Sequence, residues 1–454
     1  MRALRPFETG QYRLLAGALT ASLFGSGIWA VAMVWQVMEL GGGPVQLSAV
    51  AAAAAIGLLA AVLVGGAVAD RVPQRRILMA VELSKSLLVG AVAVLALTGS
   101  LQVGHLVVVA FMLGVADGFF YPAYSALLPS ILPAEQLLAA NGVEGVLRPG
   151  IQQAAGPALA GVLIALASPA HALAVVAVMQ LAAGVALLNL KAVQPRRELD
   201  ADQNPVAGAL MDIRDGFVYM VRTPWVLATL LLACGMIFLI MGPIQVLMPF
   251  AIREQIGGGA GAFAAALTAF GIGAGVGSMT VASLRLPRRY LTWMLLLWGV
   301  SCVPLVVVGV ATRLWPVLAA LLVVGALSSA ANVIWGTLLQ RRVPPALLGR
   351  VSSLDFFVSL ALMPVSMAVA GPVGEAIGYR ATFAIAGLVP PVLAVVAIVA
   401  ARLRRDELAY PLDAEPTPGA DPAPAADPMA AADPMPAAAP AAAREAEERA
   451  AGDA

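Results

Sequence analysis

Twelve apolar runs of membrane-spanning length occupy most of this 454-residue chain. A hydrocarbon core about 30 Å thick needs roughly 20 apolar residues in an α-helix, because each residue advances about 1.5 Å. Charged residues make up only 12% of the chain, against about 25% in an average soluble domain, and 61% of the residues are apolar. The runs therefore predict an all-α, polytopic membrane protein. They cover residues 14–38, 47–69, 77–98, 103–127, 143–167, 171–190, 225–249, 261–284, 291–311, 315–339, 353–375 and 382–401.

The runs form two sets of six around a polar stretch. Residues 1–190 hold the first six runs and residues 225–403 the last six, which predicts two helical bundles. Residues 191–224 are interpreted as a cytoplasmic linker with an interfacial helix over 206–221, because apolar residues recur there at helical spacing with charges between them. Residues 404–454 are rich in Ala, Pro and acidic residues, a composition typical of a disordered tail.

Basic residues gather in alternate connections between the runs. The connections on one side carry most of the Arg residues of the chain, whereas the opposite connections carry only Arg253, Arg313 and Arg380. The positive-inside rule places the basic side in the cytoplasm. An even number of spans then puts both termini there too. We expect a multi-pass protein of the plasma (inner) membrane, acting as a monomer among membrane lipids.

The two halves look like repeats of one another. Shifting the sequence by about 213 residues places Arg75-Arg76 on Arg288-Arg289, and the tripeptide at 155–157 recurs at 370–372. Duplicated six-helix halves are typical of secondary transporters, in which one half rocks against the other around a site near the bilayer midplane.

The connection after the second run carries a motif. It reads Gly66-x-x-x-Asp70-Arg71 followed by Arg75 and Arg76, with Val72-Pro73-Gln74 where such motifs normally place a Gly. It resembles the signature between helices two and three of the major facilitator superfamily. The resemblance implies a fold of twelve transmembrane helices in two pseudo-symmetric bundles.

Further stretches narrow the resemblance. The segments 119–123, 126–129 and 340–344 are similar to the macrolide-efflux and enterobactin-exporter branch of the drug:proton antiporters. Gly156, Pro157 and Gly161 are similar to the antiporter motif of helix five, although its preceding glycines are incomplete. The resemblance covers residues 10–403 and implies export.

In this superfamily the loop after helix two is thought to latch the cytoplasmic ends of the two halves. Asp70 could accept hydrogen bonds from the exposed N-terminus of the eleventh helix, where the positive end of the helix dipole lies. The arginines of the motif could pair with acids or lipid phosphates. We therefore predict a gating role for Gly66, Asp70, Arg71, Arg75 and Arg76. The alternative is that the loop only sets the topology.

Ionisable residues within spans are functional candidates because each is costly to place in lipid. Lys85 and Asp117 lie at similar depths on consecutive antiparallel helices, so Lys85 is the expected counter-ion of Asp117, with Glu82 one turn away as a competitor. Glu144 and Arg148 are spaced to pair along one helix. Each acid is either a proton-coupling carboxylate or part of a permanent ion pair. Coupling is favoured for Asp117, and structure or gating for Glu144 and Asp355. The arginine usual in helix four of proton antiporters is absent from 103–127.

Polar and aromatic stripes indicate the wall of a cavity. They lie on the first, seventh and tenth runs, helices that line the central cavity in the superfamily, and two glutamines within the fifth run, which need partners, are added to them. Apolar walls with a few amides suit bulky amphipathic molecules. Helix packing is the alternative for each stripe. The candidates are Trp29, Met33 and Gln36, Gln152 and Gln153, Phe238, Met241 and Gln245, and Asn332 and Trp335.

Several function classes are excluded or disfavoured. Lys85 and Lys191, the only lysines, do not follow a G-x-x-x-x-G pattern, which excludes an ATP-driven pump within this chain. His105 and His171 form no metal-ligand cluster, and no cofactor, nucleic acid partner or enzymatic activity is expected. The sequence favours a secondary exporter of hydrophobic drug-like compounds or secondary metabolites, coupled to protons. The alternatives are a siderophore exporter, or a lipid flippase or transporter-fold receptor.

Overall fold

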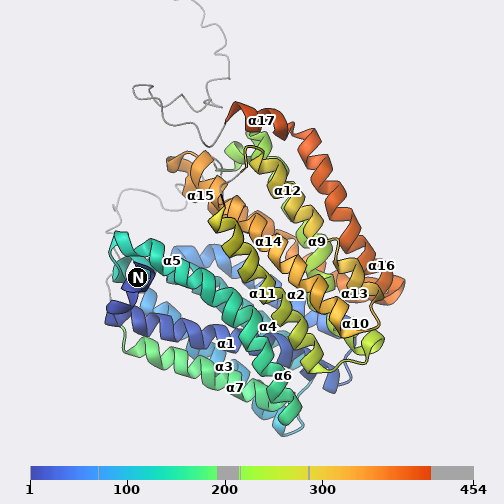
Figure 1. The fold of residues 1–454 in the computed structure, drawn as a ribbon. Coiled ribbons are helices and arrows are strands. Elements are labelled where there is room, and N and C mark those ends of the chain that lie inside the picture. Colours follow the sequence, from blue (N-terminus) through green and yellow to red (C-terminus); the bar gives the residue numbers. More distant parts are fainter. Residues whose placement is uncertain (1, 70, 192–213, 215, 285–286, 411–454) are drawn as a thin grey trace, which may run out of the picture. The chain divides into compact units, whose positions relative to one another are not determined.

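The long apolar runs of the sequence form long helices in the structure (Figure 1). The structure is a computed structural model, and it describes residues 2–69, 71–191, 214, 216–284 and 287–410. No strand occurs within these ranges. The first half begins with a short 3-10 helix, η1, and a stretch of π-helix, η2, joins two segments of its fifth span. Its elements are η1 (Arg2–Glu8), α1 (Gly10–Glu39), α2 (Pro44–Ala69), α3 (Gln74–Leu97), α4 (Val103–Ile131), α5 (Ala134–Leu147), η2 (Arg148–Ala155), α6 (Gly156–Leu166) and α7 (Pro169–Leu188).

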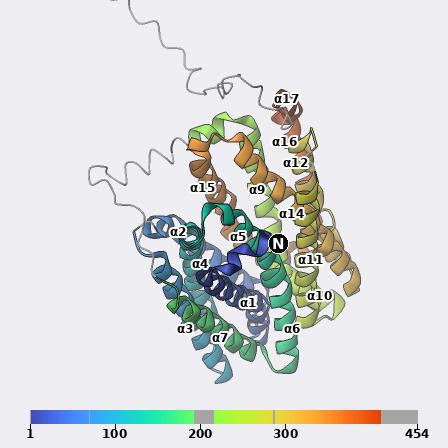
Figure 2. The same ribbon diagram turned by 60° about the vertical axis from the view of Figure 1, so that its left-hand side comes forward.

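The second half is also built of helices. Its π-helical stretch, η3, lies inside its first span. Figure 2 shows the helices of the second half beside those of the first. Its elements are α9 (Pro224–Gly242), η3 (Pro243–Leu247), α10 (Met248–Ile256), α11 (Ala260–Ser283), α12 (Tyr290–Ser301), α13 (Leu305–Val310), α14 (Leu314–Arg342), α15 (Pro345–Ala361), α16 (Met363–Ala400) and α17 (Leu403–Ala409).

Eleven stretches of the described chain are long and apolar enough to span a membrane, and the last of them contains two spans. That stretch, Leu354–Ala400, has 47 residues, or about 70 Å of helix, more than twice the hydrocarbon thickness. Gly378, with φ of 76° and ψ of 165°, interrupts it in a conformation that favours glycine. Divided there, the described residues contain the twelve spans predicted from the sequence.

Small residues let neighbouring helices approach to backbone contact. On α4, a Cβ added to Gly114 would lie 2.0 Å from the carbonyl oxygen of Ala54 on α2. On α11, a Cβ added to Gly277 would lie 1.9 Å from the carbonyl oxygen of Ala326 on α14. These two helix pairs occupy matching positions in the two halves. Each half is therefore built around one tightly packed pair.

Contacts between the halves gather at the end opposite the basic connections. The backbone N–H of Gly371 on α16 donates to the hydroxyl of Ser48 on α2 at 2.7 Å. Gly161 on α6 lies against α11, where an added Cβ would come within 2.9 Å of the Ala264 side chain. The rings of Trp35 and Phe263 stack with their centroids 5.6 Å apart. These contacts join the two halves at that end.

The predicted boundary of the tail at residue 404 is wrong, because Leu403–Ala409 form helix α17. Arg342 at the end of α14 donates to both carboxylate oxygens of Asp406, at 2.5 and 3.2 Å. Its guanidinium also lies over the rings of Trp225 and Tyr410, at 4.6 and 5.0 Å. Glu407 accepts from the backbone N–H and hydroxyl of Thr292. These contacts order a segment whose composition alone suggested disorder.

Part of the predicted linker and tail lies outside the described residues. Residues 192–213 and 215 of the linker, and 411–454 of the tail, belong to that part. Residues 216–222, the described end of the expected interfacial helix, are helical.

Substituting Gly114 by Ala tests the packing of α2 on α4. We expect a loss of about 1–3 kcal/mol, because the added methyl group would overlap the carbonyl of Ala54. Gly104→Ala on the same helix is the matched control, since nothing lies within 4 Å of a Cβ there. Thermal unfolding of the purified variants in detergent measures the difference. Equal midpoints for the two variants would contradict close packing at Gly114.

Substituting Arg342 by Lys tests the docking of α17. Lysine keeps the charge but loses the two-pronged hydrogen bond and the stacked planar group, so we expect a loss of about 1–3 kcal/mol of stability. The neighbouring Arg341 is exposed, and Arg341→Lys should leave stability unchanged. Thermal unfolding measures the loss of stability. Limited proteolysis of the segment that follows Leu403 measures whether α17 stays docked. Equal behaviour of both variants would show that Arg342 does not hold α17.

Candidate functional site

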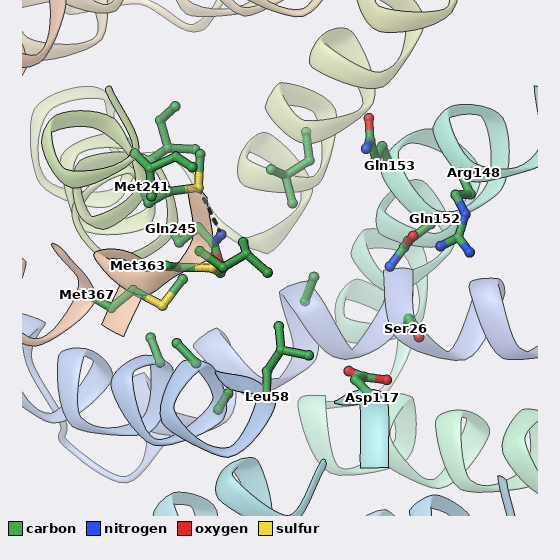
Figure 3. Close-up of a pocket in the computed structure, with 18 of the residues that line it drawn as sticks. Ser26, Leu58, Asp117, Arg148, Gln152, Gln153, Met241, Gln245, Met363 and Met367 are labelled. Carbon is green, nitrogen blue, oxygen red and sulfur yellow. Dashed lines mark hydrogen bonds between the residues drawn. The ribbon is translucent and has the colours of Figure 1, made fainter. Parts of the chain in front are cut away.

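A cavity of about 900 Å³ lies between the two halves, walled by helices from both (Figure 3). The first half contributes residues from α1, α2, α3, α4, η2, α6 and α7, and the second half from α9, η3 and α10, α11, α12, α14, α15 and α16. The contacts of α2 with α16 and of α6 with α11 close the end opposite the basic connections. This volume falls within the range of pockets that hold drug-sized molecules, about 300–1,000 Å³.

The predicted ion pair between Lys85 and Asp117 is confirmed. The Lys85 ammonium contacts Oδ1 of Asp117, and both residues line the cavity. The side chain of Lys85 is 5% exposed, whereas that of Asp117 is 45% exposed. The pair therefore presents its carboxylate to the cavity and keeps its ammonium group behind. Glu82 lies deeper, where its Oε1 accepts a hydrogen bond from the hydroxyl of Ser22 at 2.8 Å.

The predicted pair of Glu144 and Arg148 is also confirmed. Nε of Arg148 donates to Oε1 of Glu144 at 2.7 Å, and the guanidinium lies 4.9 Å from the centre of the Tyr121 ring. Arg148 lines the cavity, and Glu144 is not among the lining residues. The Arg148 guanidinium therefore lines the cavity as one partner of an ion pair with Glu144.

Tryptophans organise the polar groups of the second half. Nε1 of Trp298 donates to Oδ1 of Asn332 at 3.1 Å, and Nε1 of Trp335 donates to Oδ2 of Asp355 at 3.1 Å. The centroids of the two indole rings are 6.2 Å apart. All four residues line the cavity. Asp355, expected near the membrane interface, therefore lies in the cavity wall.

The rest of the second half's wall is rich in methionine. Thioether side chains are flexible and polarizable, so they adapt to ligands of different shape. Figure 3 shows Met241, Met363 and Met367 on one side of the cavity, opposite Asp117 and Arg148. The cavity thus has a wall with two ion pairs from the first half, and a sulfur-rich wall that also carries Asn332 and Asp355 from the second. Its methionines are Met33, Met236, Met241, Met248, Met363 and Met367.

Most of the predicted cavity residues line the cavity. Because Gln152 and Gln153 lie in η2 and Gln245 in η3, three of the cavity amides project from π-helical turns. The buried Oε1 of Gln153 has no hydrogen-bond partner among the described residues. The confirmed lining residues are Trp29, Met33, Gln152, Gln153, Met241, Gln245, Asn332 and Trp335.

Two predicted cavity residues do not line it. Gln36 is buried at 4% exposure, and Phe238 is 39% exposed and absent from the wall. Residues three apart on a helix differ by about 60° around the axis, so Gln36 turns away from Met33 and Phe238 away from Met241. Both predictions are wrong because the predicted stripe on each helix is wider than the part of that helix that faces the cavity.

The sequence reasoning missed several small or polar lining residues. Some lie on the same helices as the predicted cavity residues, and the others lie on helices for which no cavity residue was predicted. Gln180 could have been found by the rule applied to Gln152, that a glutamine within a span needs a partner. The serines carry no such signal, because their hydroxyls can bond to their own helix. The missed residues are Ser22, Ser26, Gln180, Thr229, Ser301 and Ser328.

The glycines of the helix-five motif lie at helix contacts. A Cβ added to Gly156 would come within 2.8 Å of the Cα of Gly27 on α1, and Gly161 meets α11. Pro157, between them, lines the cavity. Close packing of α6 on α1 and α11 accounts for the two glycines, and a part of the motif in antiport stays a prediction.

The basic loop motif is only partly described. Asp70 lies outside the described residues, and Arg71 and Arg76 are exposed. Arg75 donates to the carbonyl oxygens of Leu187 and Leu188 at 3.0 and 2.5 Å, which caps the C-terminal end of α7. An added Cβ would meet nothing within 4 Å at Gly66. The gating role of the motif therefore stays a prediction.

Twelve spans in two six-helix halves around a central cavity define a transporter of the major facilitator superfamily. The chain belongs to the transmembrane secretion effector family, whose model matches residues 1–420. It is 31% identical over 417 residues to multidrug efflux pump Tap of Mycolicibacterium fortuitum, covering 87% of this chain and 97% of the relative. It is 23% identical to macrolide efflux protein A of Streptococcus pyogenes, covering 87% and 97%.

Solved transporters share the fold at low sequence identity. A POT family transporter in complex with a thioalcohol-conjugated peptide superposes with a TM-score of 0.67 at 12% identity, covering 86% of this chain and 96% of that chain. The nucleoside transporter NupG gives a TM-score of 0.64 at 11% identity, covering 88% and 99%.

Cysteine labelling distinguishes lining from non-lining residues on α1. In a variant without Cys234 and Cys302, we expect Met33→Cys to react with a water-soluble maleimide at least about tenfold faster than Gln36→Cys, because thiol reactivity follows exposure. Purified protein in detergent suffices for the measurement, with labelling followed by mass spectrometry. Similar rates at the two positions would contradict the placement of the cavity wall.

Proposed function

We propose that this protein is a secondary exporter that moves hydrophobic, drug-like compounds or secondary metabolites out of the cell by alternating access. The observation that carries this proposal is the cavity between the halves, closed at one end and lined by methionines, tryptophans and a few amides. Such walls suit bulky amphipathic molecules better than sugars or phosphates. The names of the relatives, an efflux pump and an efflux protein, support transport rather than enzymatic conversion.

The distribution of charge supports an orientation in the plasma membrane. The basic connections and both termini are proposed to be cytoplasmic, by the positive-inside rule. Since the halves join at the opposite end, the structure then corresponds to a state whose cavity is accessible from the cytoplasm. An exporter loads its substrate in this state.

The charges of the cavity favour drug-like cargo over a siderophore. Siderophores and their iron complexes are commonly anionic and call for free cationic groups. Among the described lining residues, the cations are Lys85 and Arg148, and each is paired with a carboxylate. The more exposed charge of the Lys85 pair is negative. Proton antiport is proposed as the driving reaction, because carboxyl groups lie within the spans at the cavity.

Dye uptake into inverted membrane vesicles tests the proposed function. Vesicles that contain the protein should accumulate ethidium when respiration acidifies their interior, and a protonophore should abolish the uptake. Asp117→Asn should lower the uptake rate at least about tenfold, because it removes the carboxylate exposed to the cavity. Glu254 is an exposed acid in the last turn of α10 and does not line the cavity, so Glu254→Gln is the control and should transport normally.

Other outcomes would replace the proposal. Uptake that survives the protonophore would contradict proton coupling. Lipid scrambling without proton flux would indicate a flippase, and binding of dye without any turnover would indicate a receptor. Failure to accumulate any of a panel of amphipathic dyes would contradict drug export.

A further inference from the structure

A buried cluster in the first half holds two carboxyl groups and one ammonium group. The cluster consists of Glu82 and Lys85 on α3, Asp117 on α4, Ser22 on α1 and Gln180 on α7. With both carboxyls ionised its net charge is −1. A buried unbalanced charge is unfavourable, so the cluster is stable with one additional positive charge.

Glu82 is the incompletely satisfied member of the cluster. It is 1% exposed, and its Oε1 accepts from Ser22 while its Oε2 has no hydrogen-bond partner among the described residues. Gln180 is 3% exposed, and its Oε1 also has no partner. The Gln180 amide lies against Gly25, one turn along α1 from Ser22. A proton on Oε2 would turn this unpartnered acceptor into a donor.

Lys85 stands between the two carboxyls. It lies one turn from Glu82 on the same helix and contacts Asp117 across the helix pair. The phenols of Tyr121 and Tyr124 on α4 lie near the cluster, and Arg148 of η2, paired with Glu144, donates to the Tyr121 hydroxyl at 3.4 Å. From α1 and α7 the groups that face it, Ser22 and Gln180, are uncharged. One ammonium group is therefore available to two carboxylates.

Asp117 connects the cluster to the cavity. Its side chain is 45% exposed, and Oδ1 is the oxygen that contacts Lys85. Figure 3 shows its carboxylate pointing into the space beneath Ser26 and Gln152. Ser22 also lines the cavity, so its hydroxyl links Glu82 to the same space. Both the charged group of a ligand and a proton thus have a route to the cluster.

We propose that the cluster binds one added positive charge at a time, either a proton on Glu82 or an organic cation at Asp117. With Glu82 protonated, Lys85 stays on Asp117 and neutralises the carboxylate that the first half presents to the cavity, across from Asp355 in the wall of the second half. When Glu82 releases its proton to water in the cavity, Lys85 turns to the ionised Glu82 and frees Asp117 for the cationic group of an amphipathic molecule. The proton and the substrate then exclude one another, as antiport requires. This inference rests on the proposed export function and specifies its substrate as cationic.

Equilibrium binding of ethidium to the purified full-length protein in detergent tests the proposal. Ethidium is a permanent cation, so its own charge does not change with pH. Between pH 9 and pH 6, in sodium-free buffer, affinity should fall by up to about tenfold per pH unit, the slope for displacement of one proton. At pH values at which Glu82 is protonated, binding of one ethidium should release about one proton. A pH indicator in weak buffer measures this release.

Three variants separate the roles of the cluster residues. Glu82→Gln mimics the protonated acid, so ethidium should bind at least about tenfold more weakly than to the wild type at pH 9, without pH dependence or proton release. Adding Lys85→Met to Glu82→Gln should restore the affinity, still without pH dependence, because Asp117 is then free. A merely structural role for Glu82 would not predict this rescue. Glu254→Gln, outside the cluster, should keep the wild-type pH profile.

Four results would overturn the proposal. These are no ethidium binding by the wild type, unchanged pH dependence in Glu82→Gln, no rescue by the second substitution, and competition by sodium ions at constant pH in place of protons. If Glu82→Gln does not fold, absence of proton release by the wild type is decisive by itself. Dye export by wild-type vesicles together with unchanged pH dependence in Glu82→Gln would contradict this inference alone and leave the proposed function standing.

Discussion

Contact between helix backbones at small residues is the constraint on which this structure depends. Apolar side chains gain little by leaving lipid for protein, so helices in a membrane associate through close van der Waals packing. Gly114 brings α4 onto α2, and Gly277 brings α11 onto α14. Gly161 and Gly371 do the same between the halves. Gly271 in the middle of α11 also meets the backbone of Gln153, and the central cavity is the space left between the halves beside these contacts.

The two halves share a fold but divide the chemistry of the cavity between them. Helices of the first half supply the ion pairs, Lys85 with Asp117 and Glu144 with Arg148. Helices of the second half supply indole donors and most of the thioethers. A molecule with a polar group and a large apolar body therefore finds a complementary partner for each part on opposite walls. Pseudo-symmetry in the backbone has been kept while the side chains of the two repeats have diverged.

The twelve spans, the two halves and both ion pairs could be predicted from the sequence, because apolar length, charge and depth along a helix are local quantities. Gln36 and Phe238 could not be placed, since the strip of a helix that faces a cavity depends on its tilt against its neighbours. The helix at Leu403–Ala409 was missed for a related reason. It depends on Arg342, 64 residues from Asp406 in sequence, and on a ring cage that composition does not reveal. Asp70 lies outside the described residues, so the gating hypothesis rests on the sequence.

The π-helical stretches η2 and η3 set the register of the cavity wall on either side of them. A π turn closes its hydrogen bonds over five residues where an α turn uses four. Converting one into the other shifts everything beyond it by one residue, about 100° around the axis and 1.5 Å along it. Gln152, Gln153 and Gln245 sit on these stretches, and Gly156–Leu166 follows directly after the first. The same continuous helix therefore carries the amides of Gln152 and Gln153 and the contact of Gly161 with α11, which closes the cavity at the end opposite the basic connections.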